Sequence, residues 1–305
     1  MLRRLIERMR GLRQAAPHLL RPANVNADRA KISIAQLGHH YANKVVALKD
    51  VNLNVRSGEF VCLLGPSGCG KSTLLYALAG HVAPTGGSVA IDGKPIQGPG
   101  PDRLLMFQEA ALFPWLTVRG NITFALGARG VPRSERRKRA DTFIQRVRLE
   151  GFADTLPHEL SGGMKMRASL ARALAVDPNV LLMDEPFGAL DAQTRVHMQE
   201  LLQSIWLHSG KTVVFVTHDV QEALMLGTRV VLMAPRPGRV VEDLEIHLPM
   251  PRSLEDPSLD AMARDIRHRL RAAEGAPPEA PPTEPLGRRS RTPSSLPRTH
   301  VVTSR

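Results

Sequence analysis

Three short runs of the chain are almost entirely apolar, and two segments between them have a helix-forming composition. The runs over 59–64, 179–183 and 212–216 have the length of strands and no polar face, as parallel strands need when both faces of their sheet are covered. The segments over 72–79 and 192–209 have the length and composition of helices. Strands that alternate with helices in this order predict an α/β fold with a parallel sheet.

A second pattern predicts antiparallel strands. Apolar and polar residues alternate over 31–37 and 51–55, and another short strand-like run over 88–91 is followed by an Asp92-Gly93 turn. Alternation over strand length, with turn residues between the strands, is typical of sheets with one solvated face. We therefore expect an antiparallel β subdomain beside the parallel sheet.

The chain changes character over residues 109–160. Residues 131–150 are highly charged and helix-forming, with Phe143 and Val147 on an apolar stripe. We interpret the basic cluster over 136–139 as the solvent-facing side of this helix. The region predicts a helical subdomain inserted into the α/β core.

The loop between the first apolar run and its helix matches the phosphate-binding pattern G-x-x-x-x-G-K-[ST]. Its residues are Gly65, Pro66, Ser67, Gly68, Cys69, Gly70, Lys71, Ser72 and Thr73. Glycines let backbone N–H groups turn toward an anion, and the helix dipole adds positive potential there. Lys71 can reach the β- and γ-phosphates, and the Ser72 hydroxyl can bind Mg²⁺. The loop predicts a nucleoside triphosphate site.

Two carboxylates follow the second apolar run directly. Asp184 and Glu185 stand where this strand ends, and the carboxyl ends of strands are where α/β sheets hold ligands. Asp184 is placed to hold Mg²⁺. Glu185, which the metal does not need, is the natural general base for a water that attacks the γ-phosphate.

Two further motifs complete a recognisable set. Leu160-Ser161-Gly162-Gly163 opens a helix, and Thr217-His218-Asp219 follows the third apolar run. In this order, with the phosphate loop and Asp184-Glu185, they resemble an ATP-binding cassette (ABC) ATPase over roughly residues 31–250. The resemblance implies a P-loop NTPase (RecA-like) core with an antiparallel β subdomain and an inserted helical subdomain.

The resemblance also implies roles around the nucleotide. Tyr41 matches the aromatic residue that stacks on adenine, with a buried structural tyrosine as the alternative. Gln108 matches the glutamine that contacts Mg²⁺ or water and links the site to the membrane partner. His218 matches the switch histidine near the γ-phosphate. Glu185, His218 and Gln108 form the expected catalytic set.

Other matched residues imply a second copy of the chain. Ser161, Gly162 and Gly163 match the signature motif that contacts the γ-phosphate of ATP bound to the other copy. Asp191, in the run 187–191, matches the D-loop. The expected assembly is a homodimer that holds ATP and Mg²⁺ between its subunits.

One departure from the common pattern points to a subgroup. Met164 stands where the family signature usually has Gln, and Met cannot form an amide's hydrogen bonds. This variant and the runs 112–118, 235–239 and 246–252 look like those of the nitrate, sulfonate and taurine importer ATPases. The subgroup implies a membrane permease as partner, a solute-binding protein as an indirect partner, and a peripheral location on the cytoplasmic face of the inner membrane.

Charge is concentrated outside this core. The formal net charge is +12, of which residues 1–31 carry +6 and residues 272–305 carry +2. The remainder is weakly basic, which is not the footprint of a nucleic-acid-binding protein. The alternative function, a nonmembrane ABC ATPase acting on ribosomes or DNA, is therefore the second hypothesis.

The expected organisation follows from these patterns. It comprises a basic extension over 1–30, a nucleotide-binding core with the β subdomain over 31–108, the helical subdomain over 109–160, the signature helix and second half of the core over 161–250, a C-terminal helix over 251–271, and a disordered proline-rich tail over 272–305. No stretch is apolar enough to predict a membrane span. Cys62 and Cys69 are not placed to form a disulfide.

Overall fold

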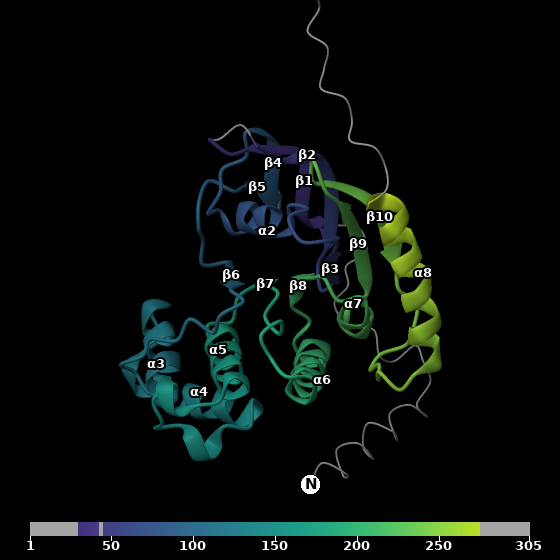
Figure 1. Cartoon of the computed structure of the whole chain (residues 1–305). Helices are drawn as coiled ribbons and strands as arrows, with labels where there is room; N and C mark the ends of the chain where they lie inside the picture. Colours follow the sequence, from purple (N-terminus) through teal and green to yellow (C-terminus); the bar gives the residue numbers. More distant parts are fainter. Residues whose placement is uncertain (1–29, 43–44, 275–305) are drawn as a thin grey trace, which may run out of the picture.

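A computed structural model of the chain describes residues 30–42 and 45–274 (Figure 1). The expected basic extension lies outside the described residues except for residue 30, and so does the expected tail from residue 275 onward. Among the described residues, no helix is both long and apolar enough to cross a membrane.

Five parallel strands and one antiparallel strand form the central sheet. In spatial order they are β10 (Arg239–Glu245), β9 (Arg229–Ala234), β3 (Phe60–Leu64), β8 (Thr212–Thr217), β7 (Val180–Asp184) and β6 (Arg103–Met106). The three predicted apolar runs correspond to β3, β7 and β8, which are adjacent and parallel. The prediction of a parallel sheet is therefore confirmed. β10 pairs antiparallel with β9 at one edge.

Both faces of the sheet are buried, which explains the apolar runs. The helices that follow or cover its strands are α2 (Lys71–Ala79), α6 (Ala192–Ser209), α7 (Val220–Leu226) and α8 (Pro257–Glu274). Val61 and Leu63 join a core with α2, whereas Phe60 joins the core on the other face with α6, α7 and α8. Cys62 and Cys69 are free and buried in these two different cores, as expected for cysteines that form no disulfide.

The predicted antiparallel sheet lies beside α2 and shares its core. Its strands, in spatial order, are β2 (Val46–Arg56), β1 (Ala30–His40), β4 (Gly86–Ile91) and β5 (Lys94–Pro95). Asp92 and Gly93 form the two-residue turn between β4 and β5, with φ angles of 51° and 75°. Positive φ at both positions is what a tight hairpin turn requires.

A third core lies among the helices α3 (Val118–Ala128), α4 (Arg133–Arg146) and α5 (Gly162–Ala175). Figure 1 shows these helices grouped at the end of the molecule opposite the antiparallel sheet. Short 3₁₀ turns over Glu150–Phe152 and Pro157–Glu159 connect α4 to α5. Since α5 shares this core, the helical unit extends past the boundary expected at residue 160.

The helix expected over 131–150 is shorter than predicted. It begins after Pro132 and ends at Arg146, because Arg148 has a left-handed backbone with a φ of 59° that cannot continue a helix. The basic cluster over 136–139 lies on this helix and is largely exposed, as predicted.

The C-terminal helix also differs from its expected bounds. α8 begins at Pro257 rather than at 251. The preceding segment is held instead by Arg252, which is buried and donates to the carbonyl oxygens of Leu224, Gly227, Ile246 and Leu248. Figure 1 shows α8 lying alongside α7 and β9.

Candidate functional site

The phosphate loop follows β3 and turns into α2 within six residues. Gly65 is packed so closely that a Cβ atom there would lie 2.4 Å from the Met233 carbonyl oxygen. Gly70, which precedes α2, has a φ of 92°, a conformation that glycine adopts without strain. Within the described residues no side chain caps the first turn of α2. Its N–H groups are therefore available to an anion.

Lys71 is held inside this loop. Its side chain is only 4% exposed, and Nζ donates to the carbonyl oxygens of Gly65 at 2.7 Å and Pro66 at 2.9 Å. Both partners are uncharged, so the ammonium charge is not neutralised by them. The lysine can exchange these carbonyls for phosphate oxygens, which form stronger charge-assisted hydrogen bonds.

Ser72 and Asp184 meet where α2 begins and β7 ends. The Ser72 hydroxyl donates to Asp184 Oδ1 at 2.9 Å, and Asp184 is buried. A hydroxyl and a carboxylate at this separation suit a hard cation such as Mg²⁺, which commonly binds one or two protein oxygens together with phosphate oxygens. Burial and the nearby Asp184 carboxylate also raise the pKa of Tyr76 to about 12.

Glu185 and His218 meet at the ends of the neighbouring strands β7 and β8. His218 Nδ1 lies 3.0 Å from Glu185 Oε2, and Glu185 has a left-handed φ of 42°. A Cβ atom built on Gly188 would lie 3.4 Å from Gln108 Nε2 and 4.0 Å from Glu185 Oε2. The three catalytic residues expected from the sequence therefore converge.

Arg195 contacts both the D-loop over residues 187–191 and the loop over residues 217–219. It was not identified by sequence analysis. It donates to the carbonyl oxygens of Phe187 at 3.2 Å and Leu190 at 3.0 Å, and Nη1 lies 4.0 Å from Asp219. A cation in the first turn of a helix opposes the helix dipole. That unfavourable placement is the sequence signal that could have identified it.

The buried carboxylate of Glu222 stabilises the loop over residues 217–219, which carries His218. Thr217, which precedes His218, donates its hydroxyl to Glu222, and Gln199 Nε2 donates to the other Glu222 oxygen at 3.1 Å. Burial raises the pKa of Glu222. Sequence reasoning did not single out Glu222, although a carboxylate within an apolar helix is a recognisable signal.

Tyr41 lies beside the phosphate loop and is exposed. Its hydroxyl is 3.0 Å from Thr73 Oγ1, and its ring packs edge-on against His39 at 4.8 Å. With 44% of its surface exposed, it is not a buried structural tyrosine.

Ser161, Gly162 and Gly163 lie in another part of the chain from the phosphate loop. The Ser161 hydroxyl caps α5 by accepting from the Met164 N–H at 3.3 Å. Asp191 caps α6, and the hydrogen bond from the Thr194 N–H lowers the pKa of Asp191. A Cβ atom on Gly163 would lie 2.4 Å from Thr194 Cγ2, so the signature and D-loop segments pack against each other.

The predicted site residues thus form two groups in one chain. Within the described part of the chain, Gly162 and Gly163 lie against Leu190 and Thr194 on the D-loop side, and the Ser161 hydroxyl bonds to the backbone of its own helix rather than to Lys71. The side chain of Met164 packs against the helical core.

The fold and the site together define the class of ABC-type P-loop ATPases. Residues 48–188 match the family model described as ABC transporter. The chain is 52% identical over 199 residues to TauB, the taurine import ATP-binding protein of Pseudomonas putida, with 65% of this chain and 76% of that protein covered. The chain therefore belongs to the ABC transporter family and is an ATP-binding subunit that hydrolyses ATP in transport.

Two solved structures share this fold. The ATP-binding cassette MJ0796, solved as a dimer bound to ADP and Pi, has a TM-score of 0.62 and 34% identity, covering 73% of this chain and 100% of that one. CbiO1 of Clostridium perfringens, part of the ABC transporter complex cbiONQ, has a TM-score of 0.65 and 27% identity, covering 80% of this chain and 97% of that one. The predicted fold class is confirmed.

Proposed function

We propose that this chain energises the import of a small oxyanion or organosulfur solute, such as taurine, an alkanesulfonate or nitrate. The observation that carries the ATPase chemistry is the convergence of Lys71, Ser72, Asp184, Glu185 and His218 at the carboxyl ends of β3, β7 and β8. The name of TauB and the importer-like runs in the sequence support the solute class.

Each residue of this group has a distinct proposed role. Lys71 neutralises charge on the β- and γ-phosphates, and Ser72 and Asp184 hold Mg²⁺. Glu185 accepts the proton of the attacking water, and its hydrogen bond with His218 orients it. Gln108 lies close enough to contact the same water or the metal. Tyr41 stacks on the adenine ring.

Two copies of the chain complete the site. Ser161, Gly162 and Gly163 of one copy contact the γ-phosphate held by the other, with Asp191 supporting the junction. The separation of this segment from Lys71 within one chain supports the proposal, as does the dimeric form of MJ0796. The weakly basic core gives no support to the alternative of action on ribosomes or DNA.

The permease contact lies on the helical unit. Trp115 is 73% exposed and Phe124 is 56% exposed, and both pack near Phe113, with ring centroids 5.6 and 4.9 Å from it. Exposed aromatic clusters are typical of interaction sites. Trp115 follows Gln108 closely in the sequence, so Gln108 connects the proposed contact to the ATP site. With this contact, the proposed location is peripheral, on the cytoplasmic face of the inner membrane.

ATPase stimulation tests the proposed solute. The complex of this chain with its permease is reconstituted, and hydrolysis is measured with solute-binding proteins loaded with taurine, an alkanesulfonate or nitrate. One loaded protein should raise the ATPase rate, and Glu185→Gln should abolish that rise. Stimulation by none of the three, with basal hydrolysis intact, would reject the solute class while leaving the ATPase assignment in place.

A further inference from the structure

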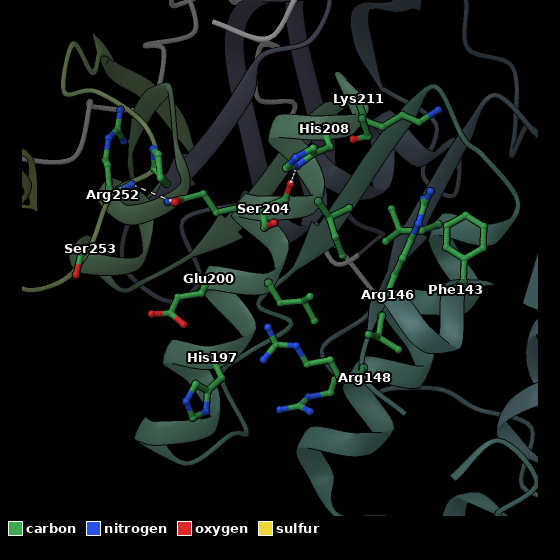
Figure 2. Close-up of a pocket in the computed structure, with 18 of the residues that line it drawn as sticks. Phe143, Arg146, Arg148, His197, Glu200, Ser204, His208, Lys211, Arg252 and Ser253 are labelled. Carbon is green, nitrogen blue, oxygen red and sulfur yellow. Dashed lines mark hydrogen bonds between the residues drawn. The ribbon is translucent and has the colours of Figure 1, made fainter. Parts of the chain in front are cut away.

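A groove of about 1160 Å³ opens between the helical unit and α6, away from the phosphate loop (Figure 2). Residues of α4 and α5 line one side, residues of α6 line the other, and the segment 251–257 contributes a third wall. Phe143, Leu201 and Ile205 are partly buried apolar residues of these walls. The groove is slightly larger than a typical small-molecule site, which has a volume of roughly 300–1,000 Å³.

Several charged groups of the groove have partners. Lys211 pairs with Asp177 at 2.5 Å, and the Arg252 guanidinium is occupied by backbone carbonyls. Arg146 lies over the ring of Phe143, 4.9 Å from its centroid. These groups are accounted for by the fold itself.

Arg148 and Arg167 are different. Within the described residues neither forms an ion pair, although Glu200, Glu255 and Asp256 also line the groove. Both side chains line the same groove, and burial, followed by the charge of Arg148, lowers the pKa of Arg167. Figure 2 shows Arg148 extending into the space between the α4–α5 side and the helix that carries His197 and Glu200.

The side chain of Arg167 has an unsatisfied donor, and the backbone of Arg148 has an unusual conformation. The Nε atom of Arg167 is buried and has no hydrogen-bond partner, which is costly for a donor. Arg148 occupies the position after α4 with a φ of 59°, a conformation that glycine adopts more easily than any side chain.

We propose that Arg148 and Arg167 form a binding site for a small organic phosphate, with the phosphate group between the two guanidinium groups. Two adjacent guanidinium groups match a dianion in charge and in fork geometry, whereas a carboxylate would balance only one of them. The apolar body of the ligand packs against Phe143, Leu201 and Ile205. The ligand then touches both α5 and α6, the helices that begin at the signature motif and at Asp191.

Phenylphosphonate, a stable dianion with an aromatic body, is the probe for this site. It should raise the melting temperature of the full chain in a concentration-dependent way. Inorganic phosphate should give a smaller shift, and benzyl alcohol, which has no charge, should give none. Because the phosphate loop can also bind the probe, the decisive quantity is the part of the shift that Arg148→Gly removes.

Arg148→Gly relieves the left-handed strain and removes one guanidinium group. The ligand-free variant should melt roughly 2–4 °C higher than the wild type, yet its affinity for the probe should fall by about tenfold or more. Arg137→Ala, which removes one exposed charge from the same helix, should keep the full shift. Glu200→Gln removes the facing carboxylate and should strengthen probe binding.

Three results overturn the site. The first is an undiminished probe shift in Arg148→Gly, and the second is an equal loss of that shift in Arg137→Ala. The third is a lower melting temperature of ligand-free Glu200→Gln without any gain in probe affinity, which would identify Glu200 as the partner of the two arginines. None of these measurements depends on ATP hydrolysis.

Discussion

Lys71 shows at the scale of one residue how the ATP site is prepared. The chain keeps this ammonium group almost out of solvent, where its partners are two carbonyl oxygens and the more distant Cys69 sulfur. An ammonium group with such weak partners gains much more from phosphate oxygens than it loses by leaving them. Glu222 is the opposite case, since it is a buried carboxylate whose two hydrogen bonds do not offset its desolvation.

We expect Lys71→Ala to lose most of its affinity for ATP. Hydrogen bonds to a charged group are worth roughly 1.5–3 kcal/mol each, so affinity should fall by at least about tenfold. Nucleotide titration by calorimetry measures the change, and a circular dichroism melt confirms that the variant folds. Unchanged ATP affinity in the folded variant would contradict the role of the phosphate loop.

We expect Glu222→Gln to make stability less dependent on pH. Below the ordinary glutamate pKa of 4.5, the wild-type carboxyl is protonated in both states and carries no ionisation penalty. As pH rises through the raised pKa of the folded protein, the unfolded chain gains more from ionisation, so the wild type loses stability. The neutral variant does not lose this contribution.

The measurement for Glu222→Gln is the difference in melting temperature between variant and wild type, from pH 4.5 to about pH 8. The difference should move in favour of the variant as pH rises, because other titrating groups are common to both proteins and cancel. A difference that stays constant would show that Glu222 ionises as freely in the folded protein as in the unfolded chain.

At the scale of elements, α8 and the segment around Trp115 differ in how they contact the rest of the molecule. α8 is anchored through Arg252, whose backbone N–H also donates to Gln203 Oε1 at 3.0 Å, while Gln203 Nε2 donates to the Met225 carbonyl at 2.7 Å. The Arg252 side chain is so enclosed that burial lowers its pKa to about 10. The segment that carries Trp115 differs from α8, because within the described residues no other element covers the Trp115 side chain, which is 73% exposed. We therefore expect its contact to be with a partner protein.

We expect Arg252→Leu to destabilise the fold by roughly 3–5 kcal/mol, since it leaves several buried carbonyl oxygens without donors. Arg252→Lys should cost less, because an ammonium group keeps the charge and three donors. Urea denaturation measures both changes. Arg264→Ala, on the exposed side of α8, is the matched control and should change stability by less than about 0.5 kcal/mol.

We expect Trp115→Ala to weaken permease binding by at least about 1–2 kcal/mol while leaving the fold intact, since an exposed aromatic anchor contributes mainly to an interface. Co-purification of the tagged variant with its permease measures the loss. Phe152→Ala, an exposed aromatic residue of a neighbouring turn, is the control. Wild-type affinity of Trp115→Ala would move the contact to another surface.

At the scale of the whole molecule, the chain carries two parts of an ATP site that do not meet. Lys71 and Asp184 lie at the sheet edge, whereas Ser161 and Gly163 lie with the D-loop at the start of α5 and α6. One chain therefore has the groups that bind and hydrolyse ATP at one place and the proposed clamp at another. In the proposed mechanism, a second copy brings them together.

We expect Glu185→Gln to separate ATP binding from hydrolysis. Removing the general base should slow turnover by roughly 10²–10⁴-fold, while loss of a negative charge near the phosphates should favour closure of two copies electrostatically. Light scattering with ATP and Mg²⁺, with and without the permease, measures closure. Adding Ser161→Arg should abolish it, because the larger side chain would stand against the facing nucleotide.

The two-copy mechanism requires that Glu185→Gln closes in the presence of ATP. If Glu185→Gln binds ATP normally but never closes, either alone or with its permease, then the two segments do not form one site. Met164 replaces the usual signature Gln, so two copies of the chain lack that amide when they close on each other. If closure is weaker for this reason, it will be seen only when the permease is present.

Much of the fold and site could be predicted because it depends on local pattern. The buried strands, the phosphate loop, and the carboxylates and histidine at strand ends are defined by the type and spacing of neighbouring residues. Parallel strands place their carboxyl ends at one edge, so Lys71, Asp184, Glu185 and His218 had to come close once the strands were recognised.

Tertiary structure decided what depends on residues far apart in the sequence. Whether Tyr41 and Trp115 are exposed is set by which segments cover them, and no local pattern contains that information. α8 begins only after the segment held by Arg252, whose hydrogen-bond partners lie in other elements. The pair Arg148 and Arg167 arises in the same way, because only packing of the α4–α5 side beside α6 brings the two charges into one groove.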